Sequence, residues 1–230
     1  MDVHPVRLEG DLQLPLNRWL WLVKWFLLIP HFVILALLWI AFILMTIGAF
    51  FVLLFTGRYP RGIYEFNLGV LRWTWRVSFY GYSALATDRY PAFSVSEEPD
   101  YPARLYVAYP EWQRKGLPLI GWWLIGIPQY ALAAVFAGGG IGIWHLGFGG
   151  VVGVLMIVVA LLLLFKNHYR QDVFDLVMGF NRWVVRVLAY AALLTPEYPP
   201  FRFDPGAREP AEPSGGAGPT LPPVTPPVAG

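Results

Sequence analysis

The chain has 230 residues, of which 57% are hydrophobic and only 14% are charged, and its formal net charge is +2. A soluble domain usually carries roughly a quarter of charged residues, so this composition disfavours a soluble globular protein, and the small net charge gives no support to a nucleic-acid partner. The absence of cysteine excludes disulfides, thiolate metal sites and thiol catalysis.

The first residues, Met1 to Asn17, are polar and include Asp2, Glu9 and Asp11. The apolar tract that follows is much longer than the hydrophobic region of about 7–15 residues in a signal peptide, and no small-residue cleavage pattern comes after it. We therefore expect this segment to be retained.

The first apolar tract has no Asp, Glu, Lys or Arg from Trp25 to Gly57. A membrane-spanning helix needs about 20 apolar residues. The stretch from Trp19 to Phe55 is just long enough to cross a hydrocarbon core twice, at about 1.5 Å per residue. We expect a tight or shallow helical hairpin that turns somewhere between Leu38 and Gly48.

A segment rich in arginine and tryptophan follows. On a helical wheel of about 100° per residue, Glu65, Arg72 and Arg76 fall on one narrow face. Arg58 would join this face if the helix began before Pro60. The two arginines of the stripe are neighbours at i and i+4, and they repel each other unless an anion or a carboxylate lies between them.

This segment could cross the membrane or lie flat among the headgroups, with Trp73 at interfacial depth. Arginine at mid-bilayer costs about 2.5–3.5 kcal/mol on insertion scales. With two spans per half, nearly all Lys and Arg residues lie on one side of the membrane, as the positive-inside rule requires. We therefore expect an amphipathic helix on the cytoplasmic leaflet.

The second half begins with a polar connector, Asp88 to Arg114, which we expect to be solvated. The uncharged tract that follows is split by a glycine-rich run, and it predicts two spans, Leu117–Ala137 and Phe148–Phe165. The glycine run has no following lysine and no acidic partner, so it indicates a hairpin turn and not a phosphate loop. Single histidines in the chain do not form a metal-ligand cluster.

The second half repeats the first at an offset of 110 residues. The identical pairs are Phe55/Phe165, Tyr59/Tyr169, Gly69/Gly179, Arg72/Arg182, Trp73/Trp183, Arg76/Arg186, Val77/Val187 and Tyr80/Tyr190. Glu65 is matched by Asp175, Tyr90-Pro-Ala-Phe93 by Tyr198-Pro-Pro-Phe201, and Pro5-Val-Arg-Leu8 by Pro102-Ala-Arg-Leu105. We therefore expect two membrane repeats, residues 1–95 and 96–203. A Pro/Gly-rich tail, residues 204–230, should be disordered.

The stretch from Gly57 to Val77, together with Thr87-Asp-Arg-Tyr-Pro-Ala-Phe93, resembles a bacterial and mainly actinobacterial membrane family, domain of unknown function 4389. The resemblance covers most of residues 1–203. It implies a membrane location and no activity. The second copy departs from the first-repeat motif, because His168, Arg170 and Asp172 replace Arg58, Pro60 and Gly62.

These observations predict an all-α integral membrane protein of two tandem repeats, each a transmembrane helical hairpin followed by an amphipathic interfacial helix. We expect four spans in a bacterial inner membrane, with both termini cytoplasmic. The expected function is a non-enzymatic membrane scaffold or accessory subunit, without cofactor or metal, that binds anionic lipid headgroups or a membrane-protein partner. The candidate binding residues are Arg58, Glu65, Arg72, Trp73, Arg76, Asp175, Arg182, Trp183 and Arg186.

Other hypotheses stay open. A small transporter or channel built from repeats is one, although neither apolar tract carries an ionisable residue at mid-membrane. An enzyme for lipid-linked substrates, using Glu65 and Asp175, is another. For the arginines, the alternative to lipid contact is internal pairing with Glu65 and Asp175, and we favour lipid contact.

Overall fold

The computed structural model describes residues 4–17, 19–81, 83–110, 126–131, 151–166, 169–200 and 204–208. The described part is mostly helical, and it also contains one small antiparallel sheet. Its elements are β1 (Val6–Gly10), α1 (Trp21–Leu27), α2 (Ile29–Thr56), α3 (Arg61–Tyr80), β2 (Ala103–Val107), α6 (Val151–Lys166) and α7 (Gln171–Ala191). The prediction of an all-α fold is therefore wrong at the two strands.

The predicted hairpin between Trp19 and Phe55 is also wrong. Helix α2 runs without interruption through Leu38 to Gly48, where the turn was expected. The chain offers no proline and no paired turn residues in this region, and a continuous helix satisfies every backbone hydrogen bond. The break comes earlier, at Leu28, because Pro30 is tolerated only in the first turn of a new helix.

The sheet joins two segments that lie far apart in the sequence. β1 pairs with β2 in antiparallel register, with Leu8 opposite Leu105 at the centre. Side chains alternate between the two faces of a strand. Leu8 and Leu105 are buried on the inner face, whereas Arg7 and Arg104 are exposed on the outer face. The polar segments at the start of the two predicted repeats thus form one sheet.

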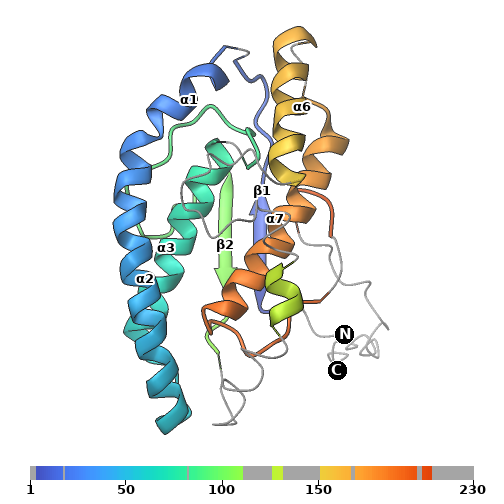
Figure 1. Cartoon of the computed structure of the whole chain (residues 1–230). Helices are drawn as coiled ribbons and strands as arrows, with labels where there is room; N and C mark the ends of the chain where they lie inside the picture. The colour runs from blue at the N-terminus through green and yellow to red at the C-terminus, as the bar shows by residue number, and fades with distance from the viewer. Residues whose placement is uncertain are drawn as a thin grey trace, which may run out of the picture.

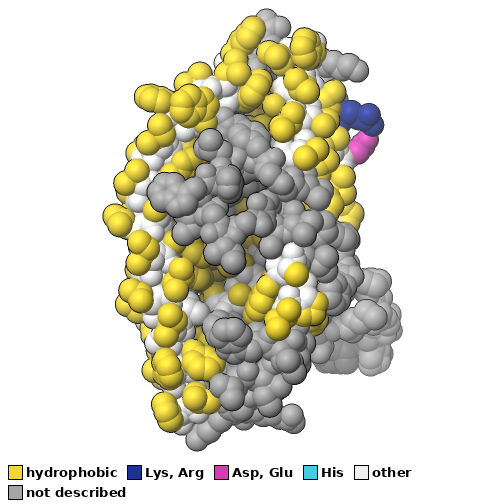
Figure 2. Space-filling view, in the orientation of Figure 1, with side chains coloured by type: hydrophobic (Ala, Val, Ile, Leu, Met, Phe, Trp, Pro, Cys, Tyr) yellow, Lys and Arg dark blue, Asp and Glu magenta, His cyan; other side chains and the backbone are white. Residues whose placement is uncertain are grey.

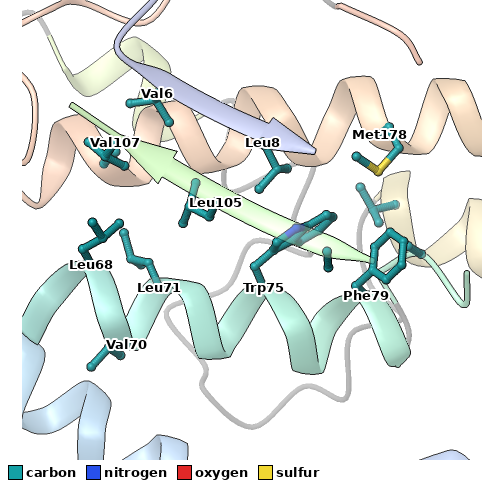
Figure 3. Close-up of a cluster of buried hydrophobic side chains, with 14 of the residues drawn as sticks. Val6, Leu8, Leu68, Val70, Leu71, Trp75, Phe79, Leu105, Val107 and Met178 are labelled. Atoms are coloured by element: carbon teal, nitrogen blue, oxygen red, sulfur yellow. The ribbon is translucent and has the colours of Figure 1, made fainter. Parts of the chain in front are cut away.

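Helices α3 and α7 pack against this sheet, α2 lies along α3, and α6 packs against α7 (Figure 1). We call α3 and α7 the inner helices, because they pack directly against the sheet. The core between them and the sheet is drawn in Figure 3, where Trp75 and Phe79 of α3 point toward the strands. Met178 of α7 joins the same cluster from the other side. The inner helices are therefore enclosed between the sheet and the apolar helices.

Among the described residues, one helix is long and apolar enough to cross a membrane, and that helix is α2. Its most apolar window has a mean hydropathy of 2.7, and 22% of that window is buried. A core helix of a soluble protein would be mostly buried, whereas most of this window of α2 is exposed. The described part does not support the four-span topology, because α6 has only 16 residues. Most of the predicted span Leu117–Ala137 and all of the glycine-rich turn lie outside the described residues.

The tail predicted to be disordered begins with an ordered segment. Residues 204–208 pack against α7 and β1, and the carbonyl of Ala207 accepts a hydrogen bond from the Gly10 amide at 2.9 Å. The Asp204 residue is buried, with 8% of its surface exposed. The rest of the predicted tail, residues 209–230, lies outside the described residues.

Candidate functional site

The arginines of the α3 and α7 stripes face the interior of the protein. Arg182 and Arg186 have no exposed surface, and 2% of Arg76 is exposed. Arg72 is the partial exception, with 19% of its side chain exposed. Because the sheet and the segments after each inner helix cover these side chains, most of the stripe does not reach a lipid headgroup in this conformation.

The first arginine of each stripe bonds to a strand of the other half. The Nε atom of Arg72 donates to the carbonyl oxygen of Leu105 in β2 at 3.1 Å. In the same way, Nε of Arg182 donates to the carbonyl oxygen of Leu8 in β1 at 3.1 Å, and its Nη2 donates to the same oxygen at 3.0 Å. Each inner helix is thus fastened to the central pair of the sheet.

The second arginine of each stripe binds the segment that follows its own helix. Arg76 donates to the carbonyl oxygens of Ser94 and Ser96, the latter at 2.8 Å. Arg186 forms an ion pair with Asp204, with 2.8 Å between Nη1 and Oδ2. Burial lowers the pKa of Arg76, and the nearby Glu98 opposes this shift. We call residues 94–98 and 204–206 the two straps, because each crosses an arginine stripe.

The acidic residues that meet the stripes are not the predicted ones. Arg72 pairs with Glu97 at 3.0 Å and Arg186 pairs with Asp204. Glu65 is exposed, and the Asp175 carboxylate accepts a hydrogen bond from Gln171 at 2.8 Å. The alternative that paired the stripes with Glu65 and Asp175 is therefore wrong about the partners. Glu97 lies four residues after Phe93, and Asp204 lies three residues after Phe201. The Tyr-Pro-x-Phe motif that follows each inner helix is therefore the sequence signal that could have identified these acidic partners.

A glycine lies beneath each strap, and only the first strap requires the absence of a side chain there. A Cβ atom at Gly69 would lie 2.8 Å from the carbonyl oxygen of Val95, closer than real Cβ contacts. A Cβ atom at Gly179 would lie 3.6 Å from the carbonyl oxygen of Asp204, in ordinary van der Waals contact. The pair Gly69/Gly179 thus sits beneath both straps, and the first strap is the tighter of the two.

A second pair of contacts crosses between the halves at the loops before α3 and α7. The Tyr59 hydroxyl donates to the carbonyl of Ala192 at 3.2 Å, and the Tyr169 hydroxyl donates to the carbonyl of Ala84 at 2.8 Å. Burial raises the pKa of Tyr59 to about 12. The residues after these two carbonyls, Leu85 and Leu193, have φ of 50° and 60°, a conformation uncommon for non-glycine residues.

The tryptophans of the candidate set are buried in the interior of the protein. Trp73 is 5% exposed and Trp183 is 2% exposed. The Nε1 atom of Trp73 donates to Nδ1 of His31 in α2 at 3.0 Å, and the His31 ring stacks on Phe93 with 3.9 Å between centroids. Trp73 therefore joins α3 to α2 and to the segment around Phe93, which follows α3 in the same half.

Arg58 is the one candidate arginine outside the inner helices. It is exposed and lies before the start of α3, because Pro60 occupies the N-cap position and ends the helix there. Arg58 is therefore not part of the stripe.

One buried charge escaped the sequence analysis. Lys24 in α1 is 2% exposed and forms an ion pair with Asp88 at 3.1 Å. It also donates to the carbonyl of Thr87 at 2.7 Å and lies 4.5 Å from the centre of the Tyr80 ring. Burial lowers the pKa of Lys24, and the charge of Asp88 opposes this shift. Lys24 links α1 to the loop after α3, a long-range contact that no local pattern marks.

The described residues contain no group of three or more His, Asp or Glu side chains that could hold a metal ion. The contacts of the stripe are guanidinium–carbonyl and guanidinium–carboxylate hydrogen bonds. Such charge-assisted bonds are roughly twice as strong as neutral ones. This arrangement therefore holds separate segments of the chain together by hydrogen bonds and ion pairs.

The fold and this site define a mostly helical protein with one long exposed apolar helix and an internal set of arginine clamps. The family model described as Domain of unknown function (DUF4389) matches residues 18–95 and 142–202, more than half of the chain. The chain therefore belongs to this family. No curated protein and no solved structure matches it.

Proposed function

We propose that this chain is a non-enzymatic membrane scaffold or accessory subunit made of two tandem halves. In this proposal, the arginine stripes hold the halves together, and the outer face of the sheet is presented to a partner protein. The observation that carries the proposal is the engagement of all four stripe arginines by groups of the same chain.

The duplicated contacts support the tandem-repeat hypothesis. Arg72 and Arg182 are equivalent in the repeat, and so are the strand residues Leu105 and Leu8 to which they donate. The hydrogen bonds of Tyr59 to Ala192 and of Tyr169 to Ala84 likewise link each half to the other. A duplicated sequence that folds with an internal two-fold relation would place each contact twice, once in each direction. The stripe then serves the fold and not lipid recognition.

The exposed apolar helices support a membrane location. Hydrophobic side chains cover the visible faces of α2 and α6 in Figure 2, and charged side chains appear there only at one edge. In α2 the most exposed large residues include Leu37, Leu44 and Phe55, at 65%, 63% and 74%. An apolar surface of this kind marks contact with lipid or with another protein.

The outer face of the sheet supports a protein partner. It carries a hollow of about 340 Å³ lined by Arg7, Glu9, Glu97, Arg104, Leu105 and Tyr106. Two arginines and two glutamates in one hollow suit a polar segment with both signs of charge. Anionic headgroups would be attracted by the arginines and repelled by the glutamates.

The role of the stripe is tested by replacing Arg72, Arg76, Arg182 and Arg186 together by Gln. We expect a lower melting temperature in mild detergent, because the straps and strands lose their donors while Asp204 stays buried. Bound lipid, measured by mass spectrometry, should not change. Loss of anionic lipid with unchanged melting would contradict the internal role and restore the lipid hypothesis.

The partner face is tested with the exposed pair Arg7→Glu and Arg104→Glu. These substitutions should leave membrane fractionation unchanged and lower the melting temperature only slightly, because Arg104 loses an exposed ion pair with Asp11 and its replacement faces Glu9 across the sheet. Proteins that co-purify with the wild type in mild detergent should be lost selectively from this variant. If the same proteins remain bound, the outer face of the sheet is not the partner site.

A further inference from the structure

The position of the charged sheet relative to α2 restricts how the molecule can sit in a membrane. Helices α2 and α3 are antiparallel neighbours: Asn67 donates to Thr46 at 3.1 Å, and Trp39 donates to Thr74 at 3.2 Å. These contacts place the middle of α3 beside the middle of α2. The order of the contacts along both helices shows that the two helices run antiparallel.

The sheet lies at the same level. Arg72, which is between Asn67 and Thr74 on α3, donates to Leu105 at the centre of β2. Tyr64 near the start of α3 donates to Val107 at 2.5 Å. The strand therefore runs alongside α3, and Figure 1 shows α2, α3 and the strands side by side with their axes roughly parallel. The centre of the sheet is thus level with the middle of α2.

The outer face of the sheet is exposed and charged at this level. Arg7 is exposed, and the side chains of Arg104 and Glu97 are 46% and 58% exposed. If α2 crossed the bilayer along its normal, these groups would lie near the bilayer centre on a lipid-facing surface. Charged side chains at that depth are rare and costly, and they almost always face a protein interior or a water-filled cavity.

We propose that α2 lies parallel to the membrane plane, immersed in one leaflet, with the outer face of the sheet turned to water. This proposal rests on the membrane location proposed above and specifies the orientation. A helix is about 10–12 Å wide with its side chains, so α2 fits within one leaflet of a hydrocarbon core about 30 Å thick. Trp19 and Trp25, beside and within α1, are 56% and 51% exposed, as is typical of interfacial anchors.

The exposed side of α2 provides evenly spaced reporters. Val33, Leu44 and Phe55 are 60%, 63% and 74% exposed. Positions eleven residues apart differ by about 20° around a helix and by about 16 Å along it. The three residues therefore share one line on the helix and span about 33 Å of its length.

Because the chain contains no cysteine, single variants Val33→Cys, Leu44→Cys and Phe55→Cys of the full chain can each carry one nitroxide label. The proteins are reconstituted in vesicles of phosphatidylcholine and phosphatidylglycerol, and label depth is measured from collisions with oxygen and with a water-soluble nickel complex. Arg104→Cys, on the outer face of the sheet, is the matched control for the opposite side.

We expect the three α2 labels to report the same depth within a few ångströms, and the Arg104→Cys label to be in water. A deep label at Leu44→Cys between two shallow labels would overturn the in-plane orientation and leave the membrane location intact. The same pattern with a water-exposed Arg104→Cys label would indicate copies that enclose a water-filled space. If all three α2 labels are in water, both the orientation and the proposed membrane location fail.

Discussion

A guanidinium that is removed from water must donate its hydrogen bonds to acceptors of the protein to remain charged. Arg186 donates to the carboxylate of Asp204, and both residues are almost completely buried. Arg186→Gln should therefore lower stability by about 3–5 kcal/mol, because it leaves a buried carboxylate without its cation. Thermal melts in one detergent measure this loss, and the exposed Arg58→Gln is the control that should change stability little.

The same ion pair gives a second check. Adding Asp204→Asn to Arg186→Gln removes the unpaired charge, so the double variant should recover part of the lost melting temperature. A double variant that is less stable than Arg186→Gln would show that Asp204 stabilises the strap by other contacts.

Tyr59 predicts a change of stability with pH. Its pKa is raised to about 12 from an ordinary value of 10 because the hydroxyl is buried. A raised pKa in the folded state contributes stability that is complete below pH 10 and is lost as pH rises toward 12. Tyr59→Phe should remove up to about 2 kcal/mol of this dependence. Melting curves between pH 9 and pH 12 should therefore be flatter for this variant, whereas Tyr106→Phe, exposed on the sheet, should behave like the wild type.

At the scale of elements, the contact between α3 and its strap depends on the absence of a side chain at Gly69. Gly69→Ala should destabilise the protein by about 1–3 kcal/mol, because the new methyl group would clash with the Val95 backbone. Gly62→Ala is the matched control in the same helix, since nothing lies within 4 Å of its added Cβ. That change should be neutral or stabilise by about 0.5 kcal/mol. Equal effects of the two substitutions would show that the strap does not pack on α3.

At the scale of the whole molecule, the crossed contacts predict that the halves stay together after the chain is cut. A protease site placed at the exposed residues Pro99 and Asp100 separates β1 and α3 from β2 and α7. The cut fragments should still elute as one complex in detergent, because β1 pairs with β2 and each inner helix donates to the strand of the other half. Fragments that separate under native conditions would contradict this architecture.

The sequence predicted that the protein is mostly helical, its family and the residues that share one face of each inner helix. It predicted these features because they depend on composition and on the helical period of 3.6 residues, which are local properties. The location of Arg58 outside the stripe was also foreseeable, since a proline before Arg61 prevents the helix from extending backwards.

The tertiary structure alone decided which way the stripe faces. An arginine stripe on an apolar helix fits a headgroup layer and a covered polar interior equally well. The groups that settle the question are the backbone carbonyls of Leu8 and Leu105 and the straps. Every residue carries a carbonyl, so no side-chain pattern can identify these acceptors, and Leu8 lies 174 residues from the arginine that it binds. Only the pairing of β1 with β2 brings these groups to the helices.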